Sequence, residues 1–380
     1  PFSIELLFFI PITIMPSKAL ILVGGYGTRL RPFTFDVPKP LVPFANKSIV
    51  MHQIEALVKV GVTEIVLAVS YQSEIMEAYL NDKAEQLGIR IIFSKEDEPL
   101  GTAGPLSLAR THLDGPDPFF VLNSDVICDF PFDQILKFHK SHGREGTIFV
   151  TQVKDPSKYG VVVADETGRI ERFVEKPTEF VGDKINAGMY VFNSGILKRI
   201  KPVPTSIERE TFPEMVKEKH LYQFVLPGFW MDIGQPLDYL KGQAMYLQSL
   251  CSKKDKTLAS STNAAVGAVI KGNVIIDPTA KVGANCVIGP SVVIGPNVVI
   301  GDSVYIAESA ILCGAKIADS AYITASIIGW ESVIGKWAHI GPDTFLGKDV
   351  AVGPGVGLYG AKVAPHKSIK DDILVPKDVM

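Results

Sequence analysis

The last third of this chain carries a six-residue repeat, and no other feature limits its fold as strongly. Aliphatic side chains recur at every sixth position, at Ile276, Val282, Ile288, Ile294, Ile300, Ile306 and Leu312. The phase slips by one residue near Ile317 and again at Ile328, and then continues to Val352. Because a period of six fits neither an α-helix nor a simple hairpin, it predicts short parallel strands stacked in coils, with the aliphatic side chains inward.

Small residues support this interpretation. Glycine often follows the aliphatic residue, and a small or β-branched residue stands four positions after it. The pattern resembles a left-handed parallel β-helix of hexapeptide repeats, which we expect over residues 266–364, followed by a C-terminal tail at 365–380. Such a stack has long faces that need cover, so we also expect the chain to self-associate.

The first part of the chain follows a different pattern. Apolar β-type runs at 19–23, 64–70, 89–93, 118–125 and 147–153 alternate with helical stretches. This alternation predicts an α/β domain over residues 15–250, with a Rossmann-like, mostly parallel sheet covered on both faces. Ligands of such sheets bind beyond the carboxyl ends of the strands. The polar segment 251–265 is expected to be a linker.

Composition excludes several classes of function. The formal net charge is −3, which argues against a basic face that binds nucleic acid. The four cysteines form no CxxC pair and are expected to be buried thiols of a cytoplasmic protein. Residues 1–14 are apolar but too short to cross a bilayer, and we expect them to be a non-native extension before Met15, with no membrane association.

The first strand runs directly into a glycine-rich loop. Gly24, Gly25 and Gly27 would let backbone N–H groups approach phosphate oxygens, and Thr28 and Arg29 follow at once. An arginine there can neutralise the outer phosphates of a nucleotide. The spacing matches neither the dinucleotide fingerprint nor the Walker loop.

A lysine in a constrained position follows this loop. Lys39 stands between Pro38 and Pro40, which largely fix its backbone. This context suits a cation that must sit at one point.

Taken together, these motifs resemble those of the sugar-1-phosphate nucleotidyltransferases. The resemblance rests on GGYGTRLRPFT and PKPL, and on the later EPLGTAGP, LNSDVICDFPF, FVEKP, INAGMY and GFWMDIGQP. From residue 15 to 380 the order and length are most similar to the beta-type members that join GTP to mannose-1-phosphate. The resemblance implies transfer of GMP from GTP to mannose-1-phosphate, giving GDP-mannose and pyrophosphate.

The resemblance also implies roles for individual residues. Asp125 and Asp232 would hold Mg²⁺, a cation that prefers carboxylate and phosphate oxygens. Arg29 would hold the departing pyrophosphate, Lys39 would sit at the reacting phosphates, and Lys176 would bind the phosphate of the sugar. Glu175, Asn186 and the backbone of Gly160 would bind sugar hydroxyls. The nucleotide would be bound by Gly24, Gly25, Gly27, Thr28, Glu96, Gly101 and Asn123.

Glu96 has a chemical reason to select guanine. The resemblance places it against the base, and a carboxylate is an acceptor for the adjacent N1–H and N2–H donors of guanine. Uracil and thymine lack that pair of donors, and adenine has an acceptor at N1. The residue therefore favours GTP.

Two alternatives remain open at this level. The chain could be a non-catalytic regulatory paralogue, although such proteins depart from the phosphate loop or lose the metal carboxylates. It could also be a nucleotidyltransferase for another pair of nucleotide and sugar phosphate, since the fold would be the same. Expected protein partners are further copies of the chain, an alpha-type regulatory subunit, or both.

Overall fold

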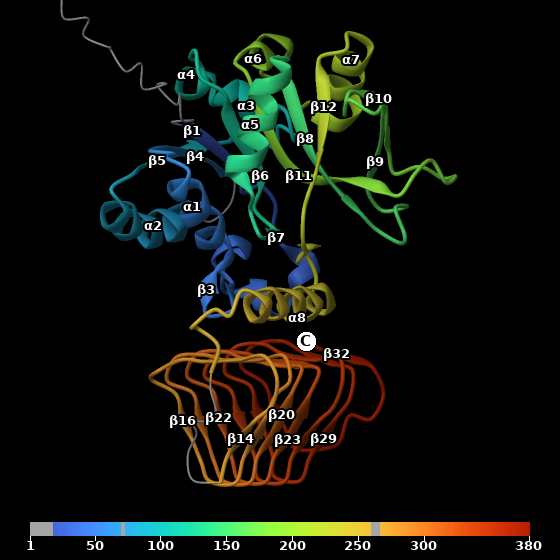
Figure 1. Ribbon diagram of the computed structural model, residues 1–380. Coiled ribbons are helices and arrows are strands. Elements are labelled where there is room, and N and C mark those ends of the chain that lie inside the picture. Colours follow the sequence, from blue (N-terminus) through green and yellow to red (C-terminus); the bar gives the residue numbers. More distant parts are fainter. Residues whose placement is uncertain (1–17, 70–72, 260–266) are drawn as a thin grey trace, which may run out of the picture.

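The computed structural model describes residues 18–69, 73–259 and 267–380. The predicted extension at 1–14 and residues 260–265 of the predicted linker lie outside these residues. Two bodies are joined through helix α8 (Pro236–Ser252): an α/β domain and a regular coil of strands (Figure 1). No helix in the described part of the chain has the length and apolar character needed to cross a membrane.

A nine-stranded sheet forms the centre of the α/β domain. Parallel pairing joins β6, β1, β4 and β5, whereas β11 runs antiparallel to β6, β8 and β9. β12 is parallel to β8, and β10 is antiparallel to β9. Seven of the nine strands therefore point the same way, and the predicted mostly parallel sheet is confirmed. The strands are β1 Lys18–Leu22, β4 Glu64–Val69, β5 Arg90–Lys95, β6 Phe119–Asn123, β8 Gly146–Gln152, β9 Gly160–Ala164, β10 Ile170–Glu175, β11 Lys184–Phe192 and β12 Leu221–Val225.

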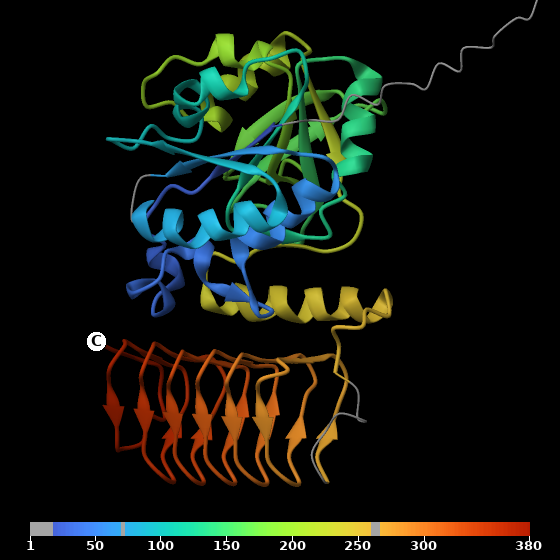
Figure 2. The ribbon, with the colours of Figure 1, turned by 90° about the vertical axis from the view of Figure 1, so that its left-hand side faces the viewer.

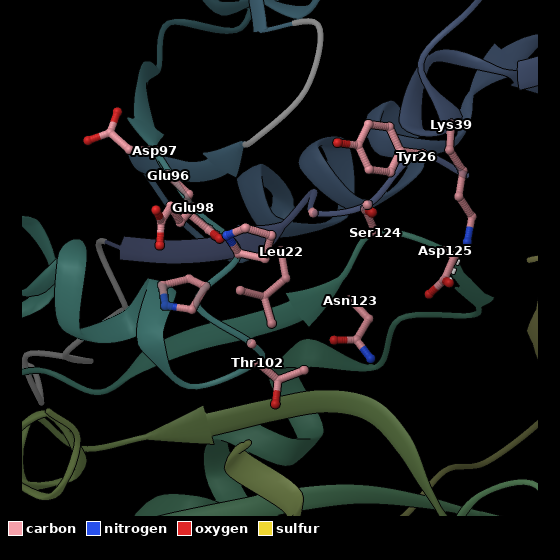
Figure 3. Close-up of a pocket in the computed structure, with 15 residues that line it drawn as sticks. Leu22, Tyr26, Lys39, Glu96, Asp97, Glu98, Thr102, Asn123, Ser124 and Asp125 are labelled. Atoms are coloured by element: carbon pink, nitrogen blue, oxygen red, sulfur yellow. Dashed lines mark hydrogen bonds and ion pairs between the residues drawn. The ribbon is translucent and has the colours of Figure 1, made fainter. Parts of the chain in front are cut away.

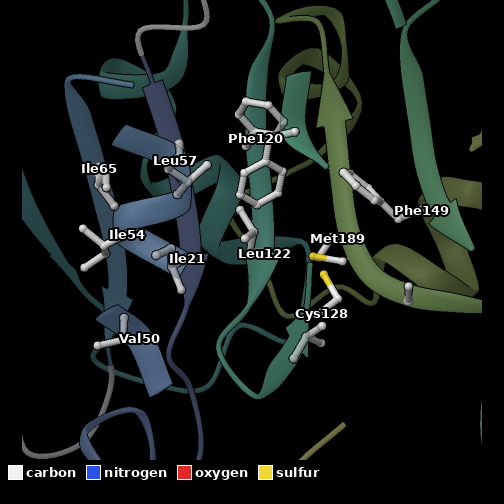
Figure 4. Close-up of a cluster of buried hydrophobic side chains, with 14 of the residues drawn as sticks. Ile21, Val50, Ile54, Leu57, Ile65, Phe120, Leu122, Cys128, Phe149 and Met189 are labelled. Carbon is white, nitrogen blue, oxygen red and sulfur yellow. The ribbon is translucent and has the colours of Figure 1, made fainter. Parts of the chain in front are cut away.

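Helices cover both faces of this sheet. Successive strand residues point to opposite faces, so each residue packs against the helices on its own side. Ile21 faces α1, α2 and α5, where it joins a cluster that includes Leu122 and Phe149 (Figure 4). Leu20, one residue earlier, faces α3, α4, α6 and α7. Burial on both sides explains why the strands are apolar throughout. The helices are α1 Ile49–Lys59, α2 Ser73–Leu87, α3 Gly104–Leu108, α4 Arg110–Leu113, α5 Phe132–His142, α6 Gly195–Arg199 and α7 Phe212–Lys217.

Short elements extend the sheet edge that carries the glycine loop. Two small antiparallel pairs, β2–β3 and β7–β13, lie between the large sheet and α8. Three 3₁₀ turns cover Thr28–Leu30, Phe33–Phe35 and Lys39–Leu41, and one π-helical turn covers Ile207–Thr211. The strands are β2 Pro43–Phe44, β3 Lys47–Ser48, β7 Val126–Cys128 and β13 Trp230–Asp232.

The repeat folds into a coil of three parallel sheets with six, seven and six strands, the predicted β-helix (Figure 2). Strand partners lie three full repeats apart in most coils, as do Val287 and Tyr305, and one residue closer where the phase slips, as do Ile300 and Ile317. The strands are β14 Val269–Ile270, β15 Val274–Ile276, β16 Lys281–Val282, β17 Val287–Ile288, β18 Val292–Ile294, β19 Val299–Ile300, β20 Tyr305–Ala307, β21 Ala310–Ile311, β22 Lys316–Ile317, β23 Tyr322–Thr324, β24 Ser326–Ile328, β25 Val333–Ile334, β26 His339–Ile340, β27 Thr344–Leu346, β28 Ala351–Val352, β29 Gly357–Leu358, β30 Ala361–Val363, β31 Ser368–Ile369 and β32 Lys377–Val379.

Two features of the C-terminal half differ from expectation. The strands continue past residue 364, since β31 and β32 pair with β28 and β30, so the segment expected as a tail belongs to the coil. Cys128 and Cys286 are buried, but Cys251 is exposed near the end of α8 and Cys313 is half-buried. The expectation of four buried thiols was wrong, because neither the six-residue repeat nor the helical pattern shows which of these positions faces solvent.

One face of the β-helix packs against the α/β domain through α8 (Figure 2). Phe345 and Ile327, on the seven-stranded sheet, share an apolar cluster with Phe33, Phe44 and Tyr239. The amide of Gln243 in α8 donates to the backbone oxygens of Ser291 and Ser309. The chain itself therefore covers one of the faces that the repeat leaves open.

Candidate active site

Two adjoining pockets lie beyond the carboxyl ends of β1 and β6, the edge where the sheet pattern placed a ligand. Both pockets are lined by Asn123 and Asp125, at and just after the end of β6. The first pocket (Figure 3) is lined by Leu22, Gly24, Gly25, Tyr26, Lys39, Glu96, Asp97, Glu98, Pro99, Gly101, Thr102, Pro105, Asn123, Ser124 and Asp125. The second is lined by Asn123, Asp125, Val126, Lys158, Tyr159, Gly160, Glu175, Asn186, Ala187, Gly188, Glu208, Trp230 and Asp232.

The glycine loop borders the first pocket through its first two glycines. A Cβ atom at Gly24 or Gly25 would meet nothing within 4 Å, so the backbone there is open to a ligand. Gly27 has φ +62°, and a Cβ at this position would lie 3.0 Å from the Cβ of Lys39. Thr28 begins a 3₁₀ turn and does not line either pocket. Gly27 and Thr28 therefore shape the loop rather than its open surface.

The two metal-ligand candidates lie side by side. Asp232, on β13, pairs with Val126 on β7, and the next residue, Ile233, donates its N–H to the backbone oxygen of Asp125 at 2.9 Å. The two carboxylates come from distant parts of the chain, and β7–β13 pairing brings them together.

Lys39 pairs directly with Asp125, with 2.5 Å between Nζ and Oδ2 (Figure 3). Burial acts to raise the pKa of Asp125, but Lys39 and Arg29 outweigh it, and the pKa lies below its ordinary value. For Asp232, burial and the neighbouring Asp125 raise the pKa to about 6. A cation would be stabilising between these two partly buried carboxylates, because they repel one another.

The guanidinium of Arg29 lies close to Asp232. A Cβ built on Gly234 would come within 2.8 Å of Asp232 Oδ1 and 3.1 Å of the Arg29 guanidinium. Arg29 therefore lies beside the carboxylate pair, although it does not itself line either pocket.

The segment that carries Asp125 is held by Gln53. This fully buried residue of α1 donates from its amide nitrogen to the backbone oxygens of Asn123, at 2.8 Å, and Val126, at 3.1 Å. The two bonds flank Asp125 on both sides. Gln53 was not predicted as a site residue, because nothing in its local sequence pattern distinguishes it from any other polar residue of a helix.

Glu96 lines the first pocket from the end of β5. It is half-buried, and one carboxylate oxygen, Oε2, accepts the Leu100 N–H at 3.2 Å. Burial raises the pKa of Glu96 despite this bond. Nearby Gly101, with φ +74°, forms a bridge to Thr205, whose backbone oxygen would lie 2.5 Å from a Cβ at Gly101.

The sugar-binding candidates gather around the second pocket. A Cβ at Gly160 would lie 2.8 Å from Glu175 Oε2, so this glycine makes room for that carboxylate. The amide nitrogen of Asn186 donates to the Tyr190 hydroxyl, and its oxygen accepts the Gly188 N–H. Lys176 is the exception, because its exposed side chain lies outside the lining of both pockets, with Nζ 3.6 Å from Glu175 Oε1.

Several lining residues were not predicted: Tyr26, Ser124, Lys158, Tyr159, Glu208 and Trp230. Tyr26 and Ser124 stand within motifs that were recognised. Glu208 and Lys158 lie in segments without a motif, and only the fold places them at the site. Asp129, by contrast, lines neither pocket and accepts hydrogen bonds from Ser249 and Lys253 of the α8 region.

Comparison with known proteins agrees with this geometry. A family model described as nucleotidyl transferase matches residues 18–249, and one described as GMPPB C-terminal domain matches residues 270–379. A mannose-1-phosphate guanyltransferase of Gibberella zeae is 58% identical over 96% of this chain and 100% of its own length. The zebrafish (Danio rerio) mannose-1-phosphate guanylyltransferase catalytic subunit beta is 56% identical over 96% of this chain and 100% of its own length.

Among solved structures, HddC from Yersinia pseudotuberculosis complexed with GMP-PN is similar with a TM-score of 0.50 and 29% identity. The match covers 60% of this chain and 97% of HddC. By sequence along nearly its whole length and by fold, the chain belongs to the nucleotidyl transferase family, among the mannose-1-phosphate guanylyltransferases.

Proposed function

We propose that this chain transfers GMP from GTP to mannose-1-phosphate, forming GDP-mannose and releasing pyrophosphate. Its nearly full-length relatives are named for this activity. The observation that carries the proposal is the position of Asp125, which lines both pockets where they meet. Two substrates held in these pockets would bring their phosphates together at this carboxylate.

Catalysis of this reaction requires positioning of the two substrates and stabilisation of negative charge, and it does not require proton transfer by a general base. A phosphate oxygen of the sugar phosphate attacks the α-phosphorus of GTP, a new P–O bond forms, and the bond from the α-phosphorus to the pyrophosphate oxygen breaks. The attacking oxygen is already ionised near neutral pH, so no general base is required. Catalysis then depends on holding two anions in line and stabilising the charge of the leaving group.

We propose that Asp125 and Asp232 hold Mg²⁺ during this reaction. In the described part of the chain, no group of three or more histidine, cysteine or acidic side chains could form a complete site. Two carboxylates fit a cation that takes its remaining ligands from substrate phosphates and water. Such an ion would neutralise charge on the phosphates.

The basic residues around this pair have complementary roles in the proposal. Lys39, now paired with Asp125, lies where it can contact the reacting phosphates. Arg29, beside Asp232, would stabilise the departing pyrophosphate. Lys176 would reach the sugar phosphate by swinging away from Glu175, which its exposed position allows.

Purified protein should be tested with mannose-1-phosphate, Mg²⁺ and each of the four nucleoside triphosphates, with pyrophosphate release as the readout. Glucose-1-phosphate serves as the control for the sugar. We expect GTP with mannose-1-phosphate to be the preferred pair. Equal use of UTP or ATP, or preference for glucose-1-phosphate, would contradict the assignment of substrates.

We further propose that the β-helix contributes to self-association or to pairing with an alpha-type subunit. The two sheets that α8 does not cover carry exposed apolar side chains, which support the proposal. These side chains include Val269, Tyr322, Val299 and Val333. Light scattering should give a particle mass above that of one chain. A monomer at micromolar concentration that also fails to bind an alpha-type chain would contradict it.

A further inference from the structure

Glu208 brings a second carboxylate into the second pocket, near the motif residue Glu175. It lies on the π-helical turn Ile207–Thr211, in a segment that carries no other lining residue of this pocket. Burial and the charge of Glu208 both raise the pKa of Glu175, which shows that the two groups are electrostatic neighbours. No family motif identified in the sequence includes Glu208.

Hydrogen-bond directions fix the role of the Glu208 carboxylate. The Thr102 hydroxyl accepts the Ile207 N–H at 2.9 Å, so its own proton is directed to Glu208 Oε2, at 2.6 Å. The Ser206 hydroxyl accepts the Arg209 N–H and donates to the same oxygen at 2.9 Å. Two O–H donors therefore hold the Glu208 carboxylate in place through one of its oxygens. Both bonds go to Oε2, and Glu208 lines the second pocket, so we assign the ligand contact to Oε1.

The charge of this end of the pocket defines what it can bind. Two neighbouring carboxylates, Glu175 and Glu208, attract groups that donate hydrogen bonds. A sugar phosphate has such donors in its hydroxyls, and it also has a phosphate. Its hydroxyls fit the carboxylate end, and its phosphate is directed toward the other end, where Asp125 and Asp232 meet Lys39 and Arg29.

Thr102 connects this carboxylate to the first pocket. It lines that pocket on the side away from Tyr26 and Lys39 (Figure 3). The backbone around it is joined to the segment before Glu208 through Ala103 N–H to Thr205 C=O, at 3.0 Å, and Thr205 N–H to Leu100 C=O, at 3.0 Å. A displacement of the first pocket's wall would therefore move Glu208 as well.

We propose that Glu208 is a sugar-binding residue that accepts a hydroxyl of the sugar phosphate, and that Thr102 is the positioning residue that holds it from the wall of the nucleotide pocket. The inference rests on the proposed function, and it deepens it by naming a residue that selects the sugar. The contact between the Thr102 hydroxyl and the Glu208 carboxylate also links the two substrate pockets.

Glu208→Gln tests the first half of this proposal. The amide oxygen will face the Thr102 and Ser206 hydroxyls, which puts an amide NH₂ group in place of the acceptor Oε1. We expect KM for mannose-1-phosphate to rise roughly 10- to 100-fold, with KM for GTP changed less than about threefold. Glu214→Gln, an exposed glutamate on the following helix, is the matched control and should resemble wild type.

Deoxy analogues separate a direct contact from a structural effect. Wild type and Glu208→Gln should be compared on mannose-1-phosphate and its monodeoxy analogues at the 2, 3, 4 and 6 positions. Wild type should discriminate against the analogue that lacks the bound hydroxyl by roughly 10- to 100-fold, and the variant should lose this discrimination for that analogue alone. Unchanged discrimination at every position would overturn the role of Glu208.

Thr102→Val tests the link, with Thr205→Val as its control because that hydroxyl bonds Val203 C=O instead. We expect Thr102→Val to raise KM for mannose-1-phosphate at least about fivefold, and the double variant with Glu208→Gln to add little more. Strict additivity would overturn the link. Wild type without activity on GTP and mannose-1-phosphate would instead contradict the proposed function itself, so the two failures are distinguishable.

Discussion

The β-helix and the carboxyl edge of the nine-stranded sheet use their residues in opposite ways. Inside the coil each position recurs once per turn of the coil, so that Ile288, Ile306, Ile323, Ile340 and Leu358 form one stack of equivalent side chains. At the sheet edge, Asp125, Lys39 and Asp232 come from three separate segments and have no equivalents. Repetition gives the coil stability through many similar contacts. At the site, by contrast, each side chain has a separate role, and no equivalent side chain can compensate for its removal.

The largest effect on stability is expected where the two regions meet. Phe345 projects outward from β27 into the apolar cluster under α8 and is 1% exposed. Phe345→Ala should lower the free energy of unfolding by roughly 3–5 kcal/mol, because it leaves a cavity between two rigid surfaces. Denaturant unfolding measures this change.

A position inside the coil provides the comparison. Ile323→Val removes one methylene from the stack and should cost only roughly 0.5–1.5 kcal/mol. If both substitutions cost the same, the larger deletion at the junction leaves no lasting cavity, and the expected rigidity of the two surfaces there is contradicted.

Removing one carboxylate of the central pair should abolish most activity without unfolding the protein. Asp232→Asn keeps the shape but removes a charge that would hold the cation, so turnover should fall at least roughly a hundredfold. Asp129→Asn is the control, since Asp129 is an acidic neighbour that bonds the α8 region. Similar turnover losses in the two variants would argue against a special role for Asp232.

Mild acid should destabilise the α/β domain. His52 is buried between Phe44 and Tyr246, donates Nε2–H to the Phe44 oxygen, and burial lowers its pKa to about 4. The unfolded chain takes up this proton near pH 6.5, so stability is full above that pH and falls as pH drops toward 4. Between about pH 6.5 and pH 5 the loss should be roughly 2 kcal/mol from this residue.

The β-helix sharpens this prediction, because both of its described histidines, His339 and His366, are exposed. His52→Gln should reduce the dependence of stability on pH, with the remainder from His139 and His142, whose pKa burial also lowers to about 4. His366→Gln should leave the dependence as in wild type. A slope that is unchanged in His52→Gln would show that other groups control acid unfolding.

The smallest expected effect concerns the choice of base. Glu96 has one oxygen on the Leu100 N–H, which leaves the other for guanine. Glu96→Gln places a donor against guanine donors, so kcat/KM for GTP should fall about tenfold more than that for ATP. An unchanged ratio between GTP and ATP would move base recognition to the backbone near Gly101.

Much of the fold follows from patterns that the sequence displays locally. The six-residue period predicted the coil, and its one-residue slips match turns of the coil that are shorter by one residue, because strand register depends on aliphatic side chains stacking in phase. The alternation of apolar strands and helices predicted the sheet and the edge where both pockets lie. The position of Asp232 next to Asp125 follows from β7–β13 pairing, and only the family resemblance connected these residues beforehand.

Contacts between distant segments could not be predicted in this way. Gln53, Glu208 and Thr102 act through hydrogen bonds to residues far away in the sequence, and no local period or composition records such a partner. The cover of one β-helix face by α8 is another example, because an apolar strand surface does not identify what packs on it.

The most direct test of the account follows one phosphorus atom through the reaction. Wild type should be incubated with Mg²⁺, mannose-1-phosphate and GTP labelled at the α-phosphate, and in parallel with GTP labelled at the γ-phosphate. We predict that the α-label appears in GDP-mannose and the γ-label in pyrophosphate, both at rates reduced at least roughly a hundredfold in Asp232→Asn. Release of the γ-label as inorganic phosphate, or no transfer of the α-label to the sugar, would contradict guanylyl transfer at this site.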